Sequence, residues 1–302
     1  MANERIFQVR ALTTNTVGVG GVQTLGFDAQ PEEVLSSPDG GIGVEDLDVA
    51  LLRVMATLSC TDVGQVNAIL ASTPGDTVFS AQQSGQPAKW STYTVPGIVW
   101  TGFNMSLPRN PVADAVLNLS GQVRFADGTK DLDDIFVLDD TIEVEPTAID
   151  PTRYFKPHTA SFDPDGDDPA IAPVHVESIS LGMAATVLSA GSDNDIGATA
   201  VDLAGWGPLE VSMTLQDAQE VASDKDIATS LVQAVRGVLT VTLKGRGGVD
   251  DGVLTINGLK FTGIAPAHGA GHSGYTVRGK ATWRNGETKY KLNAVTKLFE
   301  IA

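Results

Sequence analysis

The chain has 302 residues, of which 42% are hydrophobic, and a formal charge of −17 from 20 basic and 37 acidic residues. This length suits one large domain or two of about 150 residues, and 32 Gly and 15 Pro indicate a globular protein with many turns. The negative charge argues against tight binding of nucleic acid, because phosphate binding by counterion release needs Lys and Arg. No apolar run approaches the roughly 18 residues of a membrane span.

In the first half, the earliest recognisable short sequence motifs, here called words, are Thr24-Leu25-Gly26 and, after a long segment, residues 52–58. Thr61-Asp62 then opens a short helix with Val63, Val66, Ile69 and Leu70 at helical spacing, and Thr or Asp would cap it. Residues 117–125 alternate apolar and polar positions, which predicts a half-buried strand. Asp127-Gly128 is the chemistry of a hairpin turn. The half therefore reads as strands with one helix.

The second half repeats this order. The Thr-Leu-Gly word returns as Ser-Leu-Gly at an offset of 156 (26 to 182), and residues 52–58 return as 209–215 at 157 (52 to 209). A Trp-Thr-Gly-Phe word returns at 161 (102 to 263), and a Gly-Gln-Val word at 158 (121 to 279). A second helix is expected after Ser223-Asp224, with Ile227, Leu231 and Val235, and a second hairpin turn at Asn285-Gly286. Four matches in one order predict a tandem duplication.

Residues 138–173 are dense in Asp, Pro and Thr, which favours a solvated linker. We therefore expect a first domain over 1–145, a linker over 146–173 and a second domain over 174–302. Two Gly-rich segments, 28–46 and 190–208, occupy equivalent places in the two halves. Both are long for connections inside a compact domain, and such loops usually have a function.

No catalytic or cofactor site is expected. The Gly269-Ala270-Gly271-His272-Ser273-Gly274 pattern resembles a phosphate loop, but a strand rather than a helix follows it, so a hairpin loop is the better interpretation. Asp163, Asp165 and Asp167 form a weak calcium candidate, and the solvated linker explains them equally well. Glycines make a helical zinc site at His268 and His272 improbable. Cys60 cannot form an intramolecular disulfide, and a buried thiol is expected there.

Two expectations concern location and aromatic residues. The first residues, Met-Ala-Asn-Glu-Arg, lack the apolar core of a signal peptide, so folding in a cytosol is expected. The four Trp stand at 90, 100, 206 and 283, two of them within the repeated strand words, so core packing explains these two better than a carbohydrate cleft does.

The order of strand, long loop, strand, capped helix and Asp-Gly hairpin resembles the tail tube (major tail) proteins of long-tailed bacteriophages, in the duplicated two-domain form. The resemblance covers nearly the whole chain. It implies a mainly β fold with one short helix per unit, as two tandem β-sandwich or barrel domains. It also implies that three subunits make a pseudo-hexameric ring, that rings stack into a tube, and that double-stranded DNA passes through the lumen without specific binding.

Assembly residues follow from this resemblance. The long loops become ring-stacking loops, with Asp28, Asp39, Asp46, Asp193, Asp195 and Trp206 as candidates. The words at 52–58 and 209–215 become ring-building strands, with Leu52, Val54, Leu58, Leu209, Val211 and Leu215 as candidates. The partners are other copies of the chain and other phage tail proteins, in a virion tail assembled in the bacterial host cytoplasm, with no membrane, metal or cofactor. An acidic lumen would repel DNA phosphates over about 8 Å at physiological salt.

Two other interpretations stay open. One is a different ring-forming part of a virion, such as a tail terminator, a baseplate ring or a capsid decoration protein. The other is a carbohydrate-binding module or glycan hydrolase on a β-sandwich, for which Trp90 and Trp206 would be the residues to test.

Overall fold

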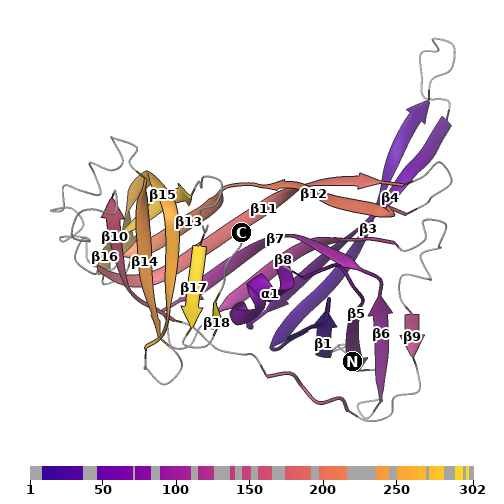
Figure 1. Cartoon of the computed structure of the whole chain (residues 1–302), viewed down its shortest axis with the longest axis horizontal. Coiled ribbons are helices and arrows are strands. Elements are labelled where there is room, and N and C mark those ends of the chain that lie inside the picture. Colours follow the sequence, from indigo (N-terminus) through magenta and orange to yellow (C-terminus); the bar gives the residue numbers. More distant parts are fainter. Residues whose placement is uncertain are drawn as a thin grey trace.

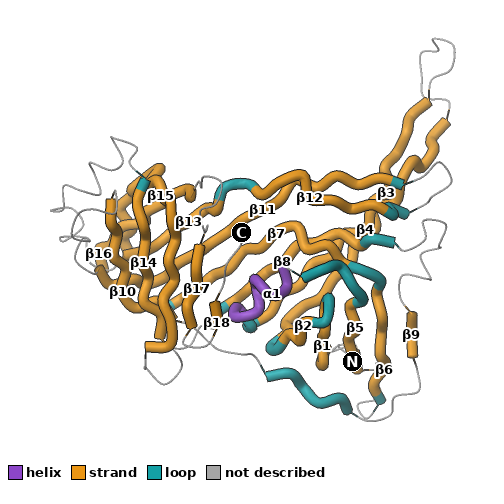
Figure 2. Tube along the Cα trace, viewed as in Figure 1, coloured by secondary structure: helices purple, strands orange, loops and turns teal. Residues whose placement is uncertain are grey.

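The computed structural model describes residues 9–36, 46–70, 72–82, 89–109, 115–125, 137–139, 145–150, 156–164, 174–191, 197–215, 236–244, 250–269, 272–281, 290–294 and 297–298. These residues are mainly β, with one short helix, α1 (Val66–Leu70), preceded by a 3-10 turn (Val63–Gln65). Strands β1 to β9 lie in the first half of the chain and β10 to β18 in the second (Figures 1 and 2). Their bounds are β1 Val9–Thr14, β2 Val17–Val19, β3 Val22–Ser36, β4 Asp46–Cys60, β5 Thr77–Gln82, β6 Trp90–Val95, β7 Ile98–Pro108, β8 Val116–Val123, β9 Val137–Asp139, β10 Lys156–Pro164, β11 Val174–Ala190, β12 Ala200–Trp206, β13 Leu209–Leu215, β14 Gly237–Lys244, β15 Asp250–Gly269, β16 His272–Ala281, β17 Tyr290–Ala294 and β18 Lys297–Leu298.

The strands form two sheets. A small sheet has the order β2-β1-β5-β6-β9, and a large sheet runs β10-β14-β15-β16-β13-β11-β7-β8-β4-β3. Within the large sheet the first half contributes β3-β4-β8-β7 and the second half contributes β11-β13-β16-β15, joined where β7 pairs with β11. The same four-strand order therefore occurs twice, side by side, in one sheet.

Two of the repeated words hold the same pairing register in both halves. Trp100 of β7 lies opposite Gly121 of β8, and Phe261 of β15 lies opposite Gly279 of β16. A β-bulge follows each pair at one equivalent residue, Thr101 and Thr262. A bulge is a defined irregularity of the ladder, so its recurrence at one position is a stronger match than alternation alone. The predicted offsets of 161 and 158 agree with this pairing.

Gly121 and Gly279 show why these positions lack a side chain. A Cβ on Gly121 would lie 2.9 Å from Ile98 Cγ2 and 2.9 Å from the Val99 carbonyl oxygen. A Cβ on Gly279 would lie 2.8 Å from Leu259 Cδ1 and 2.9 Å from the Lys260 carbonyl oxygen. Leu259 and Lys260 stand at the offset of 161 from Ile98 and Val99, so the two glycines meet equivalent neighbours.

The other two offsets differ from the sequence prediction by two residues. Just before a bulge, Val22 of β3 pairs with Cys60 of β4, and Val176 of β11 pairs with Leu215 of β13. The structural offsets are therefore 154 (22 to 176) and 155 (60 to 215), where the words predict 156 and 157. A shift of two residues keeps every side chain on the same face of its strand, which explains why the words still match.

The two long segments predicted as loops are instead parts of β-hairpins. Asp28 lies inside β3, which pairs with β4 until Ser36 meets Asp46, and β11 pairs with β12 until Ala190 meets Ala200. We call the paired residues 28–36 and 46–55 the first arm, and the paired residues 185–190 and 200–206 the second arm. Their end pairs share one offset of 154 (36 to 190 and 46 to 200), and the first arm projects beyond the sheet (Figure 1).

The predicted linker, 146–173, contains a strand. β10 pairs with β14 over its whole length and with the start of β11, in the way that β1 pairs with β5. Ala160 and Phe162 of β10 are buried and alternate, so they anchor the strand in the core. The strands of the second half therefore begin at Lys156, earlier than the expected boundary at 174. β17 likewise pairs with β15 as β9 pairs with β6.

The helix of the first half forms where it was predicted, and the second predicted helix lies outside the described residues. Asp62 makes no side-chain hydrogen bond to the helix, so it is not the expected cap; its carboxylate instead accepts a hydrogen bond from the Gly20 N–H at 3.1 Å. Val63, Val66 and Ile69 turn inward to the core. The turns predicted at 127–128 and 285–286 also lie outside the described residues.

Candidate assembly surface

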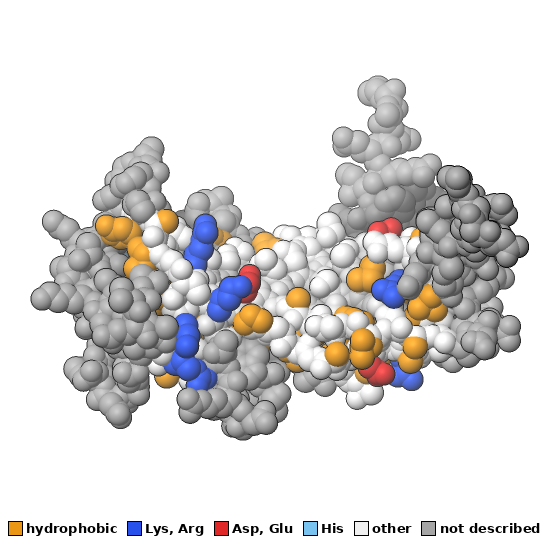
Figure 3. Space-filling model, turned by 90° about the horizontal axis from the view of Figure 1, so that it is seen from above, with side chains coloured by type: hydrophobic (Ala, Val, Ile, Leu, Met, Phe, Trp, Pro, Cys, Tyr) orange, Lys and Arg blue, Asp and Glu red, His pale blue; other side chains and the backbone are white. Residues whose placement is uncertain are grey.

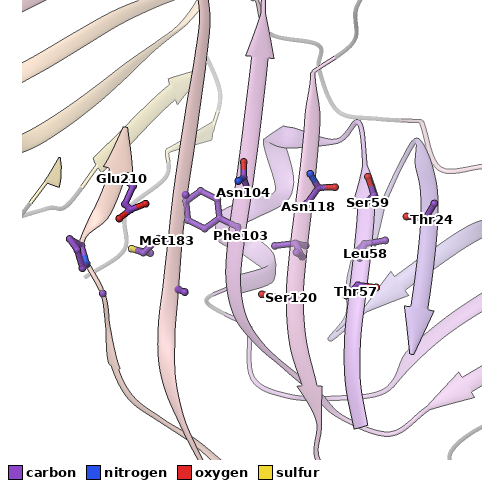
Figure 4. Close-up of a pocket in the computed structure, with 15 residues that line it drawn as sticks. Thr24, Thr57, Leu58, Ser59, Phe103, Asn104, Asn118, Ser120, Met183 and Glu210 are labelled. Carbon is purple, nitrogen blue, oxygen red and sulfur yellow. The ribbon is translucent and has the colours of Figure 1, made fainter. Parts of the chain in front are cut away.

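The side chains of the large sheet separate into an apolar core face and a polar outer face. On β7 and β8 the inward positions are buried, whereas Asn104, Asn118 and Ser120 point outward and are exposed. A shallow groove of about 730 Å³ lies on this outer face and crosses β3, β4, β8, β7, β11 and β13 (Figure 4). Its polar lining is Ser, Thr and Asn, with Glu210 as the one charged lining residue. The groove spans the junction of the two halves, which belongs to neither half alone.

The outer face becomes cationic on the second half. A neighbouring groove of about 320 Å³ is lined by Arg278, Lys280 and Glu210, and Lys260 precedes the bulge on the adjoining strand. Lys280 Nζ lies 2.8 Å from Glu210 Oε1, and both side chains remain more than half exposed. Figure 3 shows Lys and Arg side chains gathered over this half of the surface with few acidic ones. The described part of this face is therefore not acidic.

The second arm packs against the first half of the chain. Val187, Ala198 and Val201 of this arm and its turn form an apolar cluster with Leu51 and Val99. Around the cluster, Ser189 Oγ donates to Gln122 Oε1 at 2.9 Å, and the Phe125 N–H donates to the Ala198 carbonyl at 2.9 Å. Arg124 Nε donates to the Thr199 carbonyl at 3.2 Å. The arm thus covers Gln122, which is 3% exposed.

The predicted stacking-loop residues differ in their position and exposure in the structure. Asp28 is an exposed residue of β3 and accepts a hydrogen bond from Gln30 Nε2 at 2.9 Å. Asp46 begins β4, and Trp206 ends β12, where it packs partly buried against the core. Asp39, Asp193 and Asp195 lie outside the described residues.

The predicted ring-building strands have little free edge. β13, with Leu209, Val211 and Leu215, is paired along its length with β16 and with β11. β4 is paired with β3 throughout and with β8 from Met55 to Cys60, which includes Leu58; Leu52 and Val54 belong to the first arm. The ends of the repeated four-strand blocks are β3 and the later part of β15.

No metal site is evident in the part of the chain that the structure describes, since no group of three or more His, Cys, Asp or Glu residues comes together there. Asp163 lies on β10, and Asp165 and Asp167 are outside the described residues. His268 and His272 lie on the two strands of the β15–β16 hairpin, where Gly269 pairs with His272, so the prediction of a hairpin rather than a phosphate loop is confirmed. His158 and His175 are neighbours across β10 and β11, with ring centroids 5.5 Å apart.

Cys60 is buried, as predicted. Removal from water raises the pKa of its thiol to about 12; a backbone hydrogen bond at Asp62 acts in the opposite direction, and the Asp62 charge adds to the rise. The folded pKa exceeds the unfolded value of about 8.5, so the folded state keeps its proton longer. This contribution to stability is complete below about pH 8.5 and is lost as the pH rises toward 12.

We expect Cys60 to react with a chromogenic disulfide reagent at pH 8 only as fast as the protein unfolds. Adding denaturant above the unfolding midpoint should release one equivalent of thiol at once, because only the exposed thiolate is nucleophilic. The measurement is the absorbance time course with and without denaturant, and rapid reaction of the folded chain would contradict the buried position.

No known family model matches this chain, and no curated protein matches it either. No helix within the described residues is long and apolar enough to cross a membrane.

Proposed function

We propose that this chain is a structural protein that self-assembles into rings, most specifically the tandem-duplicated tail tube subunit of a bacteriophage whose stacked rings conduct DNA. The observation that carries the proposal is the doubled strand block: β3-β4-β8-β7 and β11-β13-β16-β15 share their order, two bulge positions and the β7–β8 and β15–β16 register. We interpret the two halves as two copies of one domain joined edge to edge through β7 and β11.

The pairing between β7 and β11 joins the two halves. At each end of the doubled block, the equivalent strand edge has no such partner within the described residues. Within the chain, the last strand of the first block pairs with the first strand of the second. The same contact repeated between chains is heterologous, so it generates a closed ring or an open filament. Three chains of two units would give the pseudo-hexameric ring that the resemblance implies.

The outer face of the sheet suits the wall of a conduit. Asn, Ser and Thr side chains line its central groove, and side chains of this kind offer DNA no fixed charges to bind. The first half of the described face is therefore neutral, which supports a lining that does not hold DNA.

Two observations favour this proposal over a glycan-binding module. Trp90 and Trp100 are 2% and 3% exposed, so neither offers a face to a sugar ring. The prediction of core packing is confirmed for Trp100, and Trp283 lies outside the described residues. Trp206 is the remaining described Trp and is only partly exposed. A tail terminator, baseplate ring or decoration protein would share the same fold and edge contact, and differs from a tube only in the extent of assembly.

Purified protein should form trimers, rings or tubes at high concentration. Sedimentation velocity over a range of concentrations gives the stoichiometry, and negative-stain microscopy gives the shape. Tubes of indefinite length would favour the tail tube, whereas rings of one fixed height would favour a terminator or baseplate ring. Monomers alone at high concentration, with light scattering in agreement, would overturn the proposal.

A further inference from the structure

The surface that the second arm covers on the first half has an uncovered counterpart on the second half. The offsets of 161 and 158 carry Val99 to Lys260 and Gln122 to Lys280. Gln122 is 3% exposed under the second arm, whereas the Lys280 side chain is 52% exposed. The strand edge beside it is also open: a Cβ on Gly102 would meet the Met183 carbonyl oxygen of β11 at 3.0 Å, but a Cβ on its counterpart Gly263 would meet no atom within 4 Å.

The first arm is the counterpart of the second arm; its base contacts the second arm of the same chain, where Leu51 joins the Val99 cluster and Leu52 bridges to Gly197, while its far end projects beyond the sheet. β3 is the end strand of the large sheet, and the backbone register of the first arm matches that of the second. A bulge falls between Glu32 and Glu33 in one arm and between Thr186 and Val187 in the other. Glu33 therefore holds the register position of Val187, the residue that packs against the cluster containing Val99.

The first arm and the uncovered counterpart surface differ in charge. The paired residues of the first arm, 28–36 and 46–55, contain five acidic residues, Asp28, Glu32, Glu33, Asp46 and Asp48, and one basic residue, Arg53. The uncovered counterpart on the second half carries Lys260, Arg278 and Lys280, with Glu210 as its one described acid. Val187 and the Val99 cluster make an apolar contact inside the chain, and the positions equivalent to Val187 and Val99 hold Glu33 and Lys260. Such complementarity selects one partner surface over others.

We infer that the first arm and the β3 edge bind the second half of another copy of this chain, over Lys260, Arg278 and Lys280. The contact uses the register that joins the two halves within one chain, and this inference rests on the proposed self-assembly. In the chain, Gly182 of β11 lies opposite Asn104 of β7. The offsets of 154 and 161 carry these residues to Asp28 and Ala265, so Asp28 of one copy lies opposite Ala265 of the next.

A cysteine pair tests the register directly. The double variant Asp28→Cys with Ala265→Cys places two thiols on exposed strand positions, and opposed residues of antiparallel strands have Cα atoms roughly 4.5–5.5 Å apart, within disulfide reach. Seven strand spacings separate the two residues along the sheet of one chain, about 34 Å, so the disulfide has to join two copies. Mild oxidation should give covalent dimers and trimers on a denaturing gel. The control pair Thr24→Cys with Ala265→Cys is four residues out of register, about 13 Å, and should give none.

A charge exchange tests the chemistry. Lys260→Glu should weaken self-association measured by sedimentation about tenfold or more, and adding Glu33→Lys should restore it. Lys89→Glu, at an exposed lysine of the first half, is the matched control and should leave association unchanged. Thermal melting of each variant at low protein concentration checks that the fold is intact.

The outcomes separate this inference from the proposed function. In-register cross-linking together with rescue by charge exchange supports it. Rings or tubes that form normally but yield no cross-link, or that ignore Lys260→Glu, overturn this contact and leave the assembly proposal standing. Failure of the unmodified chain to associate under any condition overturns both.

Discussion

Replacing Trp100 with alanine should lower the free energy of unfolding by about 3–5 kcal/mol, the range found for removal of a buried Trp or Phe side chain. Trp100 is 3% exposed in the core, and its Nε1–H donates to Thr14 Oγ1 at 3.1 Å. Thr14 Oγ1 in turn lies 2.7 Å from Thr77 Oγ1, so the indole connects β7 of the large sheet to β1 and β5 of the small one. The substitution would leave a cavity and would remove the indole partner of the Thr14 hydroxyl group. Urea unfolding followed by circular dichroism, at one fixed protein concentration, measures the loss.

Trp206→Ala serves as the comparison, because Trp206 ends β12 and is only partly buried. Its loss should be clearly smaller. Trp100→Phe should fall between the two, since it retains a ring but removes the N–H donor. A loss below about 1 kcal/mol for Trp100→Ala would contradict the placement of this side chain between the two sheets.

Valine at Gly121 and valine at Gly279 should each destabilise the fold by about 1–3 kcal/mol, and by similar amounts. Each new Cβ would approach an apolar side chain and a carbonyl oxygen of the neighbouring strand at 2.9 Å or less. The carbonyl belongs to the backbone, so it cannot move aside as a flexible side-chain end could. The free energies of unfolding of the two variants, measured by chemical denaturation, give the comparison.

Gly263→Ala is the matched control for the glycine pair. Gly263 lies on β15, which pairs with the strand of Gly279, but a Cβ on Gly263 would meet no atom within 4 Å. Its effect should stay within about 0.5 kcal/mol of the unmodified chain in the unassembled state. If Gly279→Val proved neutral while Gly121→Val did not, the equivalence of the two strand blocks would lose its energetic support.

The sequence predicted the strands whose faces differ most in polarity. β13 alternates buried Leu209, Val211, Met213 and Leu215 with partly or fully exposed residues, and it forms at the predicted residues. The same period of two limits what can be learned about register. A word such as Thr-Leu-Gly fits equally well after a slip of two residues, and the bulges next to Val22 and Val176 that fix the true register leave no mark in the residue pattern.

The arms and β10 were missed for a different reason. Residues of the first arm pair through backbone hydrogen bonds, so its acidic sequence remains compatible with strands. In β10, Pro157 and Asp163 suggest a linker, and the alternation of Ala160 with Phe162 is too short to outweigh them. The packing of the second arm on Leu51 and Val99 depends on the meeting of distant segments, which no local pattern encodes.

Salt should separate folding from the proposed self-assembly of this protein. The contact of the second arm with the first half is built on Val187, Val201 and Val99, and apolar burial of this kind is not weakened by added sodium chloride. The proposed contact of the first arm with the next copy pairs acidic with basic residues, and the screening length falls to about 3 Å at 1 M salt. Concentrated salt would therefore release folded single chains, and dilution would return them to rings.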